Sequence, residues 1–154
     1  MGIRRCAAVL GSATALALAT AATASASRPA ITVSPFSFSA VDTQSCSFPN
    51  RQVYTGTVRT IAYANGRAKM FFRIVGTISA NGKSLTDSDH YSLTVRPDGS
   101  AVLVGSIIHI RLPGGGVVAD SGRILFDAGG NVVAVSGRQD QLTGNLGAFC
   151  AALS

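Results

Sequence analysis

Short runs in which hydrophobic and polar residues alternate, separated by turn residues, extend over most of this chain. The clearest run is 69–79, where the apolar side chains are Met70, Phe72, Ile74 and Ile78 and the residues between them are mostly polar. A period of two places the apolar side chains on one face of a β-strand and the polar ones on the other. Between residues 31 and 139 no long apolar stripe has the 3.6-residue period of a helix. The pattern predicts an all-β fold.

Turn residues divide the chain into about seven expected strands. Asn65-Gly66, Asn81-Gly82 and Pro97-Asp98-Gly99 have the composition of tight turns. The expected strands are 31–41, 52–64, 69–79, 90–96, 101–112, 117–126 and 131–137. The segment 83–88 is polar, and we expect it to be a loop.

Three segments carry additional information. Run 31–41 contains Pro35, which predicts an edge strand or a bulge. Run 101–112 is apolar on both of its faces, which predicts a central strand covered on both sides. The tail 145–153 can form one or two helical turns.

Together the elements predict a single small antiparallel β-barrel of about seven strands with a short C-terminal helical turn, because a closed barrel leaves no exposed strand edge. A β-sandwich is the alternative.

The N-terminus has the organisation of a secretory signal peptide. Arg4 and Arg5 precede an alanine-rich apolar run, and Ala24-Ser25-Ala26 follows as a small-residue cleavage site. We expect residues 1–26 to be removed, leaving 27–154 as one secreted β domain, extracellular or envelope-associated, without stable membrane insertion. Cleavage lowers the formal net charge from +6 to +4.

Cleavage also removes Cys6 and leaves two cysteines. In an exported chain, two cysteines predict one disulfide bond. It would join Cys46 and Cys150 and close a loop of about 104 residues.

The arginines of the expected mature domain are spread along the chain, with no basic run and no interleaved aromatic residues. That distribution indicates a solvated surface and argues against a nucleic-acid partner.

Few residues are candidates for chemistry. Asp87 and Asp89 are the only close pair of acids in a chain without glutamate, and we interpret them as part of a solvated turn. A two-histidine, one-carboxylate metal site would need His90 and His109 to meet across neighbouring strands. Antiparallel pairing about the turn at residues 97–99 places His90 opposite Ile107 instead, so no metal site is predicted.

His109 and Arg111 share one face of their strand. If that face lines a barrel interior, the two side chains could hold an anionic or carbonyl group of a ligand. If it faces water, they are ordinary solubilising residues. The glycines at 114–116 lack the helix and the Lys-Ser/Thr ending of a phosphate loop, and no Gly-x-Ser-x-Gly motif accompanies them. We therefore predict no catalytic residue, no metal and no cofactor.

The last third of the chain contains Leu-Pro-Gly-Gly-Gly, Asp-Ser-Gly-Arg-Ile-Leu-Phe-Asp, Gly-Gly-Asn-Val-Val and Phe-Cys-Ala-Ala-Leu. In these motifs it resembles small, uncharacterised secreted proteins of GC-rich bacteria. In expected architecture the chain is similar to the antiparallel barrels of the allene oxide cyclase, dirigent and lipocalin type. The resemblance implies a barrel that can hold an apolar small molecule, and it assigns no site residue.

Three functions follow as hypotheses. The first is a secreted, non-catalytic barrel that binds a small apolar ligand, suggested by the two-sided apolar segment 101–112 and the missing catalytic motifs. The second is an extracellular protein-interaction module or inhibitor with an envelope protein as partner, suggested by the exposed Gly/Pro loop at 113–116. The third is a cyclase-like barrel enzyme, since a pocket can catalyse with polar groups that form no linear motif.

Overall fold

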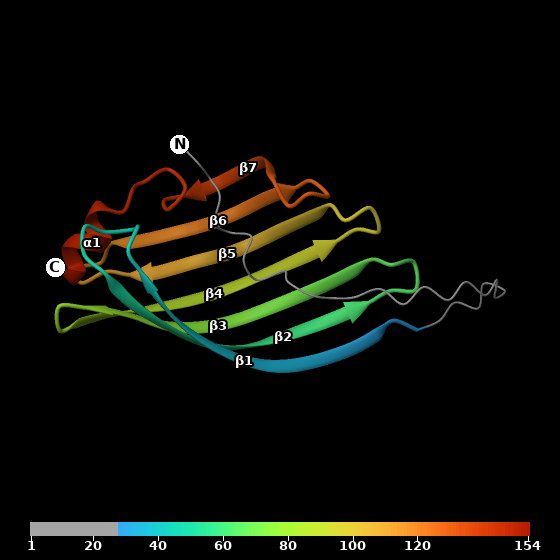
Figure 1. Cartoon of the computed structure of the whole chain (residues 1–154), viewed down its shortest axis with the longest axis horizontal. Helices are drawn as coiled ribbons and strands as arrows, with labels where there is room; N and C mark the ends of the chain where they lie inside the picture. Colours follow the sequence, from blue (N-terminus) through green and yellow to red (C-terminus); the bar gives the residue numbers. More distant parts are fainter. Residues whose placement is uncertain (1–27) are drawn as a thin grey trace.

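The computed structural model describes residues 28–154, and the predicted signal peptide lies outside this range. Seven strands are followed by one short helix (Figure 1). They are β1 (Ala30–Asp42), β2 (Asn50–Ala62), β3 (Ala68–Ala80), β4 (Lys83–Val95), β5 (Ala101–Arg111), β6 (Val117–Phe126), β7 (Val132–Gln139) and α1 (Gly147–Leu153). The predicted all-β class, the strand number and the C-terminal helical turn are confirmed.

The strands form one antiparallel meander in which each strand pairs with the next along the chain. They make a single bent sheet, so the two-sheet sandwich is wrong (Figure 1). Within the described residues β1 and β7 are the two edges and do not pair with each other, so the sheet is open where the barrel prediction expected closure. Pro35 lies in the edge strand β1, as predicted, where a missing N–H disturbs the ladder least.

The first half of β4 corrects the prediction of a polar loop at 83–88. Ala80 pairs with Lys83, so the turn consists of Asn81 and Gly82 alone, both with positive φ, as a two-residue hairpin turn requires. The alternation of the new strand then begins at once, with Leu85 buried. The sequence pattern concealed this strand because its next two inward positions are occupied by aspartates.

A β-bulge in β5 explains why this strand is apolar on both faces. Ser106 pairs with Ser121 but Ile108 pairs with Asp120, so Ile107 is an extra residue. A bulge of one residue reverses the faces beyond it. Val104 therefore points away from the face that buries Ile110, and this residue is 46% exposed. The expected cover on both sides of this strand is absent in the described part of the chain.

We call the two sides of the sheet the inner face, on which α1 packs, and the outer face. Phe149 and Leu153 of α1 form the main buried cluster with Ile78, Leu85, Ile110 and Val118 of the sheet. The helix lies at the end of the sheet that holds the β1–β2 loop and the β3–β4 turn (Figure 1). No helix in the described part of the chain is long and apolar enough to span a membrane.

Two contacts hold this end of the molecule together. Cys46 in the β1–β2 loop forms the predicted disulfide bond with Cys150 of α1, with a Cα–Cα distance of 5.6 Å. The Asn81 side-chain amide donates a hydrogen bond of 2.9 Å to the carbonyl oxygen of Leu153. The bridge and the helix therefore fasten the chain's C-terminus to one end of the inner face.

Candidate functional site

A cavity of about 830 Å³ lies on the inner face, next to α1. Its walls come from β1 to β6, the tail after β7 and the helix. Most of the lining side chains are apolar or aromatic: Phe36, Phe38, Tyr54, Val58, Phe72, Ile74, Ile78, Tyr91, Ile107, Ile108, Ile110, Val118, Leu146 and Phe149. The bulge in β5 supplies two consecutive isoleucines to the wall, Ile107 and Ile108. Size and lining are typical of a site for a small organic molecule.

Five aromatic side chains form a continuous wall across the first four strands. Phe38 stacks on Tyr54 with ring centroids 5.0 Å apart, and Phe72 stacks on Tyr91 at 4.7 Å. Phe36 joins the two pairs, since its centroid lies 6.5 Å from those of both Phe38 and Phe72. These separations are within the range in which aromatic pairs attract each other.

A glycine lets one of these rings cross the neighbouring strand. Gly76 of β3 lies between Tyr54 and Asp87 in the strand register. A Cβ atom on Gly76 would come within 2.2 Å of the Tyr54 ring. Because that atom is missing, the phenol lies over β3 and its hydroxyl donates a hydrogen bond to Asp87 Oδ2 at 3.3 Å.

Asp87 and Asp89 are buried at this wall, which makes the interpretation of a solvated turn wrong. The two residues are 1% and 5% exposed, and both line the cavity. Asp87 Oδ1 accepts a hydrogen bond of 2.8 Å from the backbone N–H of His109, so both oxygens of Asp87 have donors. Asp89 Oδ1, by contrast, accepts no hydrogen bond from any described residue.

The surroundings of the carboxyl pair favour the protonated form of Asp89. Burial, together with the negative charge of Asp87, raises the pKa of Asp89 to about 8. Burial and the charge of Asp87 also raise the pKa of the Tyr54 phenol, and burial raises that of Tyr91. The Asp89 carboxyl therefore keeps its proton to a higher pH than an exposed aspartate does.

His109 and Arg111, the ligand-binding candidates from the sequence, lie elsewhere. They flank buried Ile110 on β5, so their side chains point away from the inner face, and neither lines the cavity. His109 reaches the site through its backbone N–H alone. His90 also points away from the aspartates that precede it, and the described residues contain no group of three potential metal ligands.

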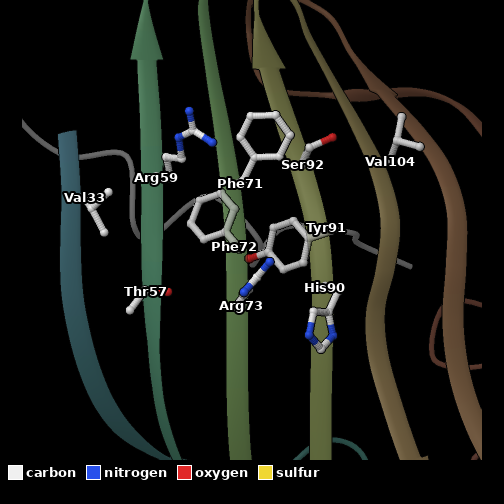
Figure 2. Close-up of a pocket in the computed structure, with 10 residues that line it drawn as sticks. All are labelled: Val33, Thr57, Arg59, Phe71, Phe72, Arg73, His90, Tyr91, Ser92 and Val104. Carbon is white, nitrogen blue, oxygen red and sulfur yellow. The ribbon is translucent and has the colours of Figure 1, made fainter. Parts of the chain in front are cut away.

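A second hollow of about 600 Å³ is shown in Figure 2. Apart from Phe72 and Tyr91, its lining residues occupy outer-face positions: Val33, Thr57, Arg59, Phe71, Arg73, His90, Ser92 and Val104. Arg73 and His90 are direct neighbours in the register of β3 and β4. The basic side chains near the middle of the sheet are thus on the face opposite the aspartates.

Comparison of the chain with protein-family models, with curated proteins and with solved structures gives no match. We therefore infer function from the cavity itself.

Proposed function

We propose that the protein binds a small, largely apolar molecule in the inner cavity. The observation that carries this proposal is the cavity of about 830 Å³ with its aromatic wall on one side and its aliphatic wall on the other. Apolar ligands gain free energy from leaving water in proportion to the apolar area that they bury, about 25 cal/mol per Å². The few polar groups at the aromatic wall would orient such a ligand.

Binding is tested with 1-N-phenylnaphthylamine, a neutral dye that becomes fluorescent in apolar surroundings. The oxidised protein should bind the dye saturably, and Ile108→Trp or Val58→Trp should weaken binding because the larger side chain occupies part of the cavity. The matched control is Val75→Trp, since Val75 is 57% exposed on the outer face of β3. The proposal fails if the dye does not saturate, or if the control loses binding as the cavity variants do.

A second candidate function is a proton-transferring enzyme such as a cyclase or isomerase. The observation that favours it is a carboxyl kept protonated near neutral pH beside a hydrogen-bonded Asp87, because such a carboxyl can act as a general acid. A metabolite extract of the producing cells, incubated with the protein, should then show a product that Asp89→Asn does not form. An extract left unchanged by the wild-type protein would count against this candidate.

The predicted export remains part of the proposal. The bridge between Cys46 and Cys150 is compatible with an oxidising compartment, where disulfide bonds persist. We propose that the domain acts outside the cytoplasm after loss of residues 1–26, and mass spectrometry of the secreted protein would test the cleavage. A protein-interaction module, with the exposed loop at 113–116 as its contact, stays a prediction.

A further inference from the structure

The cavity has one unsatisfied acceptor. Asp89 is 95% buried, lines the cavity and leaves Oδ1 without a hydrogen bond among the described residues. A buried oxygen of this kind costs free energy, on the order of 1–3 kcal/mol, unless a donor reaches it. Tyr54 and the His109 N–H are already directed at Asp87. A ligand with an N–H group inside the cavity would supply a donor to Asp89 Oδ1.

The cavity also has an uncompensated negative charge. Asp87 and Asp89 are the only charged side chains among the described residues that line it. The basic side chains closest to them in the register, Arg73 and His90, lie on the outer face. A carboxylate surrounded by apolar walls is unfavourable without a positive partner.

The walls beside the carboxyls suit a cation. Tyr91 follows Asp89 on the same face of β4, and Tyr54 contacts Asp87. The face of an aromatic ring attracts ammonium groups, most strongly where water is excluded. Carboxylate and aromatic faces together form the environment in which proteins hold organic amines.

We propose that the inner cavity selects a cationic ligand, a protonated primary or secondary amine on an apolar body, whose N–H donates to Asp89 Oδ1. The apolar body would contact the isoleucines of β5 and the helix, and the ammonium group would lie at the carboxyl pair. This inference rests on the proposed function, because it names the ligand class of the same cavity.

The test uses three probes that share one naphthalene ring and differ in charge. They are 1-naphthylmethylammonium, 1-naphthylmethanol and 1-naphthylacetate, each titrated as a competitor of 1-N-phenylnaphthylamine at pH 7. We expect the ammonium probe to bind about tenfold or more tightly than the alcohol, and the carboxylate to bind most weakly. In Asp87→Asn/Asp89→Asn the ammonium should lose this advantage while the alcohol still binds.

The control variant is Asp98→Asn, which removes one negative charge from an exposed turn and should leave the order of the probes unchanged. Equal binding of the three probes by the wild-type protein overturns the amine proposal and leaves the apolar cavity intact. An ammonium preference that persists in the double variant also overturns the amine proposal. If no probe and no dye binds, the proposed function itself is wrong. The wild-type comparison needs no variant, so the proposal can fail even if the double variant does not fold.

Discussion

The hydroxyl group of Tyr54 donates a hydrogen bond of 3.3 Å to Asp87 Oδ2 across the full width of β3. This contact joins the aromatic wall to the carboxyl pair, and it exists because the residue between the two side chains is Gly76. The organisation of the cavity thus depends on a position that has no side chain.

Tyr54→Phe tests the hydrogen bond alone. The ring and its stacking on Phe38 remain, but Asp87 loses one donor, so we expect the free energy of unfolding to fall by about 1–3 kcal/mol. Denaturant unfolding measures the change. The control is Tyr63→Phe, because Tyr63 lies at a turn with Arg67 over its ring at 4.2 Å, a contact that phenylalanine keeps. Equal effects of the two substitutions would contradict the role of the Tyr54 hydroxyl.

Gly76→Ala tests the space under the ring. The new methyl group would overlap Tyr54, so we expect a loss of about 1–3 kcal/mol in stability and weaker dye binding. Gly147→Ala is the matched control, since nothing lies within 4 Å of its added Cβ in the first turn of α1. It should be neutral or stabilising by up to about 1 kcal/mol. A Gly76→Ala protein as stable as the wild type would refute the steric argument.

Asp89 should make stability depend on pH in a defined direction. A carboxyl whose pKa is raised to about 8 binds its proton more tightly in the folded than in the unfolded protein. The folded state is therefore favoured most at low pH, and the contribution is lost as pH rises from about 4 to about 8. The slope cannot exceed about 1.4 kcal/mol per pH unit for one proton.

Asp89→Asn isolates this contribution from those of its neighbours. The groups that face Asp89 are Asp87 on the same strand, Tyr54 on β2, Tyr91 on β4 and the His109 N–H on β5. Buried Asp120 also has a raised pKa and adds a slope of the same sign, which the variant keeps. Unfolding titrations at pH 4 to 8 should show a flatter dependence for Asp89→Asn. Parallel curves for the two proteins would show that folding does not raise the pKa of Asp89.

The disulfide bond should contribute strongly to stability. A bridge that closes a loop of about 100 residues is worth on the order of 4.7 kcal/mol through the entropy of the unfolded chain. Cys46→Ala/Cys150→Ala should therefore lower the melting temperature markedly and loosen α1. Reductant should do the same to the wild-type protein and leave the double variant unchanged. A variant that melts at the wild-type temperature would show that packing alone holds α1 on the sheet without the disulfide bond.

Sequence patterns predicted much of the fold because most strands alternate cleanly between turn residues that are easily recognised. The edge strand with Pro35, the helical turn and the disulfide all followed from local chemistry. The expected closure of the barrel was wrong: β1 and β7 do not pair. Whether they pair depends on contacts between the two ends of the chain, which local sequence patterns do not contain.

The candidate site was not predictable in the same way. Polar residues at inward positions give a strand the composition of a loop. The pattern therefore predicted a loop at 83–88 instead of a strand that buries Asp87 and Asp89. The bulge at Ile107 shifts the pairing register of β5 by one residue and so exchanges the two faces beyond it. Counting alternating positions in the sequence does not show such a shift. One signal was present: the alternation of Tyr91, Leu93 and Val95, extended backwards along β4, reaches Asp89, Asp87 and Leu85.

The inner cavity is where we propose that this protein binds its ligand. The most direct test of this proposal is a titration of ¹⁵N-labelled, oxidised protein with the neutral dye 1-N-phenylnaphthylamine, followed by amide chemical shifts. We predict saturable changes at Asp87, Asp89 and Tyr91 on β4, at Ile107 and Ile108 on β5, and at Phe149 on α1. Changes confined to the outer-face hollow around Arg59 and Arg73, or no saturable change, would contradict the claim.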